Sequence, residues 1–229
     1  MAKLTYHGHA CVELLAGDGT RILIDPFLTD NPRAVVGPEH FDRLDYLLLT
    51  HGHFDHVADA WEILRRTDAT LVATFEIVSY AQERQGVRNA HPLHIGGGWA
   101  FPFGRVKLTP AIHGGQVAGE GAEGYTTLPA GILLSIDGHR VYHAGDTALT
   151  MDMSLLRGSV DTALLPIGDN FTMGPEDAAR AVEMIEPAVV IPIHYDTFEL
   201  IEQDPEAFRR LVGDSADVVV MAPGASYDL

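Results

Sequence analysis

The 229-residue sequence predicts an α/β fold of four layers (αββα), with two mixed β-sheets inside and helices on both outer faces. Two observations predict it. Each half of the chain begins with short segments in which apolar and polar residues alternate, as in half-buried antiparallel strands. Each half then continues with strands that alternate with helices, which is typical of parallel pairing. Two such halves packed face to face form a sandwich with the sheets inside.

The first half contains three short strands, then a loop rich in proline and glycine, then a strand-helix-strand-helix series. The run Tyr46-Leu47-Leu48-Leu49-Thr50 is nearly continuous in apolar residues, which indicates a strand covered on both faces. Gly86 is placed to end the second helix. The expected strands are 3–6, 11–15, 21–25, 46–50 and 70–74, the loop is 29–44, and the helices are 55–66 and 75–85.

The second half repeats this order. The Gly-rich segment 114–129 has little periodicity and is long enough to predict a functional lid over a cleft. No linker or low-complexity tract interrupts the chain, so we expect residues 1–229 to form a single domain. The expected hairpins are 99–103 with 105–111 and 132–136 with 140–143, the later strands are 162–166, 189–193 and 218–221, and the helices are 175–186 and 205–212.

Composition excludes some classes of partner. The net charge of −17 repels phosphate backbones, which argues against nucleic acid. The single cysteine, Cys11, cannot form an internal disulfide and is expected to be a buried residue in a strand. The N-terminus lacks a signal-peptide pattern, and no apolar run is long enough to span a membrane. We therefore expect a cytoplasmic protein that acts on a small molecule; whether it forms a homo-oligomer stays open.

The motif with the most chemical content is His51-Gly52-His53-Phe54-Asp55-His56. It follows the apolar strand directly and precedes a helix, and Gly52 allows a tight turn between the two. Four potential metal ligands therefore lie on one short loop, where His51 and His53 can face one cation while Asp55 and His56 face another. Crowding four such groups together without a cation would be costly, so the motif predicts a metal site.

This string resembles the HxHxDH signature of the metallo-β-lactamase superfamily. The other elements of that family occur in order, each at an expected strand end: Asp25 in Leu23-Ile24-Asp25-Pro26, His113 after Thr109-Pro110-Ala111-Ile112, Asp146 in Ala144-Gly145-Asp146-Thr147, and His194 in Ile191-Pro192-Ile193-His194. Over residues 3 to 224 the sequence is also similar to a bacterial and archaeal family of uncharacterised metal-dependent hydrolases. Asp169 and Asp196 are departures from the pattern of that family that leave the ligand positions intact.

The resemblance implies the metallo-β-lactamase fold and two divalent metal ions per chain. The first ion would be held by His51, His53 and His113, the second by Asp55, His56 and His194, and Asp146 would bridge them. Asp25 would orient ligating histidines through hydrogen bonds. Imidazole and carboxylate ligands without thiolate make zinc the first expectation, with manganese, iron, nickel and cobalt as alternatives.

The implied activity is hydrolysis of an ester, lactone, thioester, amide or phosphodiester bond by a hydroxide activated between the ions, with Asp55 as the catalytic base. Two alternatives remain: a di-iron redox enzyme on the same fold, and a non-catalytic metal-binding protein. Tyr125, in the segment 114–129, is a candidate for substrate contact. His9, which follows Gly8 near a sheet end, is a candidate either for substrate contact or for supporting a metal ligand. The roles of His7 and His9 are left open.

Overall fold

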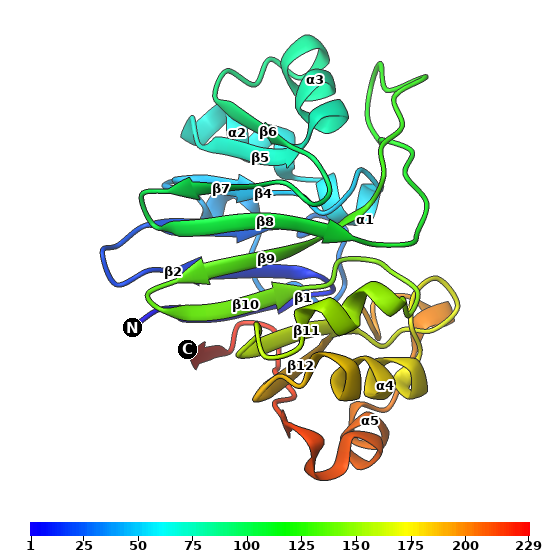
Figure 1. Cartoon of the computed structure of the whole chain (residues 1–229). Coiled ribbons are helices and arrows are strands. Elements are labelled where there is room, and N and C mark those ends of the chain that lie inside the picture. Colours follow the sequence, from blue (N-terminus) through cyan, green and yellow to red (C-terminus); the bar gives the residue numbers. More distant parts are fainter.

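The computed structural model describes residues 1–229 and contains two seven-stranded mixed sheets (Figure 1). In the first sheet the order is β14-β1-β2-β3-β4-β5-β6; pairing is antiparallel from β14 to β3 and parallel from β3 to β6. Its strands are β1 (Lys3–Gly8), β2 (Cys11–Leu15), β3 (Arg21–Ile24), β4 (Tyr46–Leu48), β5 (Thr70–Thr74), β6 (Ala90–Leu93) and β14 (Ser226–Asp228).

The second sheet repeats this plan in the order β13-β12-β11-β10-β9-β8-β7. Pairing is antiparallel from β7 to β10 and parallel from β10 to β13. Its strands are β7 (Gly98–Phe101), β8 (Gly104–Pro110), β9 (Ala130–Ile136), β10 (His139–His143), β11 (Thr162–Pro166), β12 (Val189–Ile193) and β13 (Asp217–Val218).

The helices lie on the outer faces, as Figure 1 shows for α2 and α3 at one end of the view and α4 and α5 at the other. They are α1 (Phe54–Val57), α2 (Ala60–Thr67), α3 (Phe75–Arg84), α4 (Pro175–Ile185) and α5 (Pro205–Val212), with short 3-10 turns at Pro38–His40, Met151–Leu156, Glu199–Ile201 and Gly213–Ser215. No helix has the length and apolar character that crossing a bilayer requires.

Alternation along the parallel strands creates the four layers. In β11, Leu164 belongs to the central core between the sheets, whereas Ala163 and Leu165 belong to the core beneath α4 and α5. In β4, Leu48 faces the central core and Leu47 faces α2 and α3. A strand buried on both faces needs apolar residues at consecutive positions, which explains the continuous apolar runs. The four-layer arrangement predicted from the sequence is confirmed.

The structure differs from the predicted elements at one helix and at three strands. The helix expected over 55–66 is two helices, because Asp59 between them turns its carboxylate to the backbone N–H groups of Leu28 and Thr29, at 2.7 and 3.0 Å. The strand β6 contains a proline and β14 has only three residues, so neither carried a strand signal; both are edge strands, where proline and short length are tolerated. The strand expected over 218–221 is Asp217–Val218.

Strand direction gathers the polar strand ends at one edge of the sandwich. Strands β3 and β4 are parallel, and β10, β11 and β12 are parallel. Asp25 follows β3, Asp146 lies three residues beyond β10, and His194 follows β12. In α/β folds a crevice forms outside the carboxyl ends of parallel strands, which makes this edge the place to look for a functional site.

Candidate metal centre

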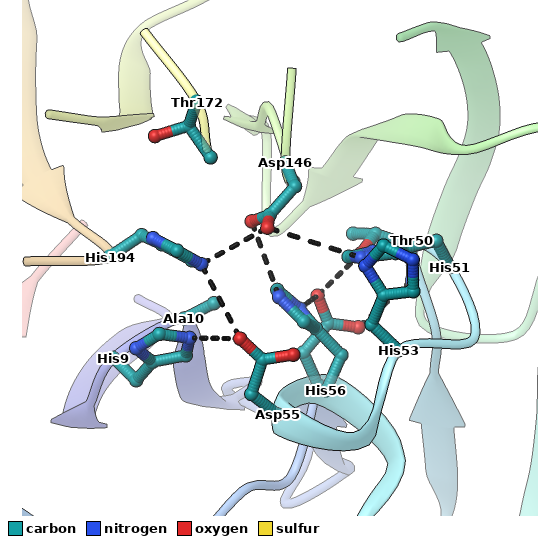
Figure 2. Close-up of polar contacts among 12 residues, drawn as sticks. His9, Ala10, Thr50, His51, His53, Asp55, His56, Asp146, Thr172 and His194 are labelled. Carbon is teal, nitrogen blue, oxygen red and sulfur yellow. Dashed lines mark hydrogen bonds and ion pairs between the residues drawn. The ribbon is translucent and has the colours of Figure 1, made fainter. Parts of the chain in front are cut away.

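The seven residues expected to ligate metal come together at this edge, and Figure 2 labels all of them except His113. His51, His53, Asp55 and His56 lie on the turn between β4 and α1 and on α1 itself. The other three arrive on separate loops of the second sheet: His113 after β8, Asp146 after β10 and His194 after β12.

Three histidines form one group. His51, His53 and His113 each offer a ring nitrogen, and these atoms all lie within 4.8 Å of one another. His113 Nε2 is 3.1 Å from His53 Nδ1. His51 is fully buried, whereas the other two border open space. Neutral imidazole nitrogen is a favourable ligand for zinc and for other transition metals.

A second group lies beside the first. Asp55, His56 and His194 offer an oxygen and two nitrogens within 4.8 Å of one another, together with His9. His194 Nε2 is 3.7 Å from Asp55 Oδ2. One carboxylate and two imidazoles again form a donor set suited to a borderline or hard divalent ion.

Asp146 lies between the two groups. Its Oδ1 is 3.2 Å from His56 Nε2, while its Oδ2 is 3.0 Å from His194 Nε2, 3.4 Å from His113 Nε2 and 4.0 Å from His51 Nε2. Figure 2 shows its carboxylate directed toward rings from both groups. One carboxylate therefore reaches both groups, the position that a bridging ligand needs.

The turn that carries Asp146 depends on glycine and histidine. Gly145 has a φ of +62°, and a Cβ added there would lie 2.8 Å from the Cβ of Thr50. His143 accepts a hydrogen bond from the Gly145 N–H and donates its Nε2–H to the carbonyl of Ala10. His143 thus fixes the backbone ahead of Asp146.

The buried carboxylate of Asp25 orients one histidine in each group. Asp25 Oδ2 accepts the Nδ1–H of His56 at 2.8 Å and the hydroxyl of Thr50 at 2.6 Å. Because the Thr50 hydroxyl donates to Asp25, it accepts the Nδ1–H of His51 at 3.0 Å. Both rings therefore carry their proton on Nδ1 and turn Nε2 toward Asp146. This arrangement gives Asp25 the orienting role that the resemblance implied.

His9 contacts a carboxylate of the cluster and does not line the cavity. Its ring is fully buried, with Nε2 3.1 Å from Asp55 Oδ2 and Nδ1 2.9 Å from Thr197 Oγ1. Burial, followed by the nearby His194, lowers the pKa of His9 to about 4, so the ring is neutral at pH 7 and donates Nε2–H to Asp55. Of the two roles considered for His9, the geometry favours support of a ligand and not substrate contact: the ring holds Asp55 in place.

Left-handed backbone marks three of these positions. Asp25, His9 and His194 have φ values of +48°, +56° and +55°. Such conformations are uncommon outside glycine and cluster at functional sites. Each of the three residues turns the chain sharply at or near a strand end, and the His194 N–H donates to the His9 carbonyl at 2.7 Å. This strained backbone is a signal of the site that the sequence does not display.

Electrostatics inside the cluster favour charge separation. Burial raises the pKa of Asp146, but the adjacent His194 and His56 outweigh it and hold that pKa well below its usual value. Conversely, burial lowers the pKa of His194, but the charge of Asp146 and the close approach of the Asp146 and Asp55 carboxylates raise it to about 9. The pKa of His56 is raised well above its usual value, because the effect of Asp146 and Asp25 outweighs that of burial.

Several buried atoms in the cluster lack a hydrogen-bond partner. They are Nε2 of His51, Nε2 of His56, both ring nitrogens of His194 and Oδ1 of Asp146. Buried polar atoms are nearly always paired, and leaving one unpaired costs about 1–3 kcal/mol. All but Nδ1 of His194 converge on the space around the Asp146 carboxylate. The residues present therefore fit a pair of metal ions, which would satisfy these atoms together.

A cavity of about 680 Å³ opens onto this cluster. His53, Asp55, His113, Asp146 and His194 line its floor, and the segment 114–129 contributes Gln116, Val117 and Ala118 to its wall. Sequence reasoning missed the remaining wall residues, Phe54, Phe171, Phe198 and Leu200, because isolated apolar residues in loops carry no periodic signal.

The segment 114–129 reaches the cavity through a close backbone contact. The Ala118 N–H donates to the Gly52 carbonyl at 2.7 Å, and a Cβ added at Gly52 would lie 2.8 Å from the Cα of Val117. Tyr125 lies elsewhere: its ring packs against Tyr80 and its hydroxyl donates to Glu83 at 2.5 Å. The expectation that Tyr125 contacts substrate is corrected, because this tyrosine fastens the segment to α3.

His7 also lies away from the cavity. Its buried ring has Nε2 3.4 Å from Glu13 Oε2 and packs edge-on against Phe41. Glu13 also accepts a hydrogen bond from Arg21. The question left open for His7 is therefore answered structurally: it packs in the first sheet and does not join the cluster.

Comparison with known proteins identifies the family. Residues 20–195 match the model of the beta-lactamase superfamily domain. A metal-dependent hydrolase of Shouchella clausii is 50% identical over 210 residues, 90% of this chain and 91% of the relative, and one of Geobacillus sp. is 48% identical over 99% and 100%. The solved structure of Igni18, a metallo hydrolase of Ignicoccus hospitalis, is 36% identical over 100% and 99%, with a TM-score of 0.87. The chain therefore belongs to the beta-lactamase superfamily and, within it, to the UPF0173 family of metal-dependent hydrolases.

Proposed function

We propose that this hydrolase uses two divalent metal ions to cleave an ester, lactone, thioester, amide or phosphodiester bond of a small molecule. One ion would be held by His51, His53 and His113, the other by Asp55, His56 and His194, and Asp146 would serve both. The observation that carries this proposal is the set of unpaired buried atoms around Asp146. When bound, such a pair would bring the pKa of water near neutrality and polarise the scissile bond.

The protein's own residues would complete the reaction. Asp55 is anionic because the adjacent His194, the charge of His56 and the hydrogen bond from His9 outweigh burial and lower its pKa. Asp55 lines the cavity, and His9 holds its Oδ2 in place. Asp55 would therefore be oriented to accept the proton of an attacking water. The cavity wall would shield the reacting bond from bulk water, which strengthens electrostatic interactions within the site.

Zinc is the first choice of metal, with manganese, iron, nickel and cobalt as alternatives. The test is a panel of esters, lactones, thioesters, amides and phosphodiesters, assayed with protein of measured metal content. We expect hydrolysis of one class, loss of that activity on chelation and recovery on addition of metal. Activity that survives complete removal of metal would contradict the proposal. Iron content with visible absorbance would instead indicate the di-iron redox alternative.

Metal binding is expected to release protons and to strengthen as pH rises. Without metal, His194 has a pKa of about 9 and His56 a raised pKa, so both rings are charged at pH 7. A metal ion binds only the neutral ring, so both protons must leave. We expect release of roughly two protons per chain, and affinity that increases from pH 7 toward pH 9. Calorimetric titration in two buffers of different ionisation enthalpy measures this release; identical heats in both buffers would contradict it.

A further inference from the structure

The wall of the cavity is apolar although the protein is strongly acidic. Above the ligand floor, Gln116 is the sole polar side chain of the lining. The apolar side chains come from the start of α1, from the segment 114–129, from the loop between β11 and α4, and from the loop after β12. They are Phe54, Val117, Ala118, Phe171, Phe198 and Leu200.

Three of these side chains are exposed at the mouth of the cavity. Phe54, Phe171 and Leu200 expose 56%, 52% and 66% of their surface. Isolated exposed apolar residues need no explanation, but several that line one hollow mark a surface that binds something. Burying such surface stabilises a complex by about 25 cal/mol per Å², so an apolar group placed here would gain affinity from all three.

The aromatic part of the wall is fixed in position. The buried ring of Phe27 contacts both Phe54 and Phe198, with ring centroids 5.8 and 6.1 Å apart, and Phe54 and Phe198 are themselves 6.2 Å apart. Phe198 also packs edge-on against His9, the ring that holds Asp55. The aromatic wall and the ligand floor thus both pack against His9. An apolar group of a substrate that binds the wall would therefore lie at a fixed distance from the reacting bond.

The lining contains no lysine and no arginine. Sites that bind phosphate groups usually surround them with cationic side chains or backbone N–H groups. Here the only cations near a substrate would be the metal ions on the floor, and the protein carries a net charge of −17. A substrate with further anionic groups would place them against phenylalanine and leucine, where they would lose hydration without gaining a partner.

We propose that the substrates are carboxylic esters, thioesters or lactones whose acyl side is an uncharged hydrocarbon chain or ring, held by Phe54, Phe171, Phe198 and Leu200 while the carbonyl lies over the ligand floor. This inference rests on the proposed function and narrows its list of bonds. Water adds to the carbonyl carbon, the bond from that carbon to the leaving oxygen or sulfur breaks, and the proton released from water goes to Asp55 and then to the leaving group.

The first test is a series of p-nitrophenyl esters from acetate to octanoate, with bis(p-nitrophenyl) phosphate as the anionic comparison, assayed on protein loaded with zinc. Each buried methylene is worth about a fourfold gain in kcat/KM, so we expect roughly a fifteenfold rise from acetate to butyrate and a further rise to octanoate. No dependence on chain length, or activity confined to the phosphodiester, would overturn the substrate assignment and leave the hydrolase function standing.

Two exposed wall residues allow variants that keep the fold. In Phe171→Ser and Leu200→Ser the ratio of kcat/KM for octanoate to that for acetate should fall several-fold. Leu155→Ser is the matched control, because Leu155 is 79% exposed but lies on the Met151–Leu156 turn outside the cavity lining; its ratio should equal that of the wild type. A ratio that is unchanged in both wall variants would overturn the proposal.

A binding measurement separates this proposal from the proposed function. 2-Decanone and acetone are uncharged ketones without a hydrolysable bond, so their binding can be followed by saturation-transfer NMR without turnover. We expect 2-decanone to bind, and its affinity to fall in Phe171→Ser and Leu200→Ser but not in Leu155→Ser. Such binding without hydrolysis of any compound in the panel would support the apolar cavity and contradict the proposed hydrolytic reaction. Equal binding of the two ketones would overturn the apolar cavity, whatever the activity.

Discussion

Replacing Asp146 with alanine is expected to release metal from both groups and to reduce hydrolysis below the detection limit. Its carboxylate lies within 3.0 to 4.0 Å of ring nitrogens from His51, His56, His113 and His194. Loss of a residue that contacts both groups should reduce metal affinity by more than the roughly 10–100-fold that follows loss of an indirect partner. Metal content per folded chain, measured by mass spectrometry after gel filtration, and the rate on the best substrate of the panel test this expectation.

The variant Asp146→Asn separates charge from volume. It fills the same space but removes the negative charge that lies between the two groups of ligands, so metal content and activity should again fall sharply. Asp214→Ala is the control, because Asp214 is an exposed carboxylate in the Gly213–Ser215 turn. Two metal ions per chain in Asp146→Ala would show that this residue does not bridge the groups.

The second large effect is expected at a residue that touches no metal. In Asp25→Asn an amide replaces the carboxylate oxygen that accepts both from His56 Nδ1–H and from the Thr50 hydroxyl. One histidine of each group then loses the contact that fixes its orientation and tautomer, so metal affinity should fall about 10–100-fold at both sites. Competition titrations against a chromophoric chelator give the two affinities.

Asp59 offers a matched control for Asp25. It is also a buried carboxylate that accepts three hydrogen bonds, from the N–H groups of Leu28 and Thr29 and from the Thr29 hydroxyl, but none of its partners is in the cluster. Asp59→Asn should lower the free energy of unfolding and leave metal affinity unchanged. If the two variants lost affinity equally, Asp25 would act through general stability and not through His51 and His56.

Much of the fold was predictable because burial imposes periodicity on the sequence. The run 46–50 is buried on both faces and was identified as a strand, and the order of strands and helices gave the four layers, which the structure and the match to the beta-lactamase superfamily confirm. Edge strands such as Ala90–Leu93 and Ser226–Asp228 were missed, because a strand that pairs with a neighbour on one side only does not need an apolar pattern.

Site residues that belong to a sequence motif could be predicted. Those whose positions depend on tertiary packing could not. The turn 51–56 was found from local sequence, and Asp146 and His194 were found from the resemblance to the metallo-β-lactamase superfamily. The role of His9 was not, because its partner Asp55 is 46 residues away and the contact depends on a left-handed backbone. Tyr125 was misplaced because a Gly-rich segment does not reveal which side chains turn away from the cavity. The apolar wall could not be predicted, because it is assembled from loops that meet only in the folded chain.

The most direct test of this account is an anomalous-difference map from crystals of the zinc-loaded protein. We expect two peaks per chain, one among His51, His53 and His113 and the other among Asp55, His56 and His194, with the Asp146 carboxylate between them. A single peak, or a peak away from these side chains, would contradict the proposed pair of metal ions.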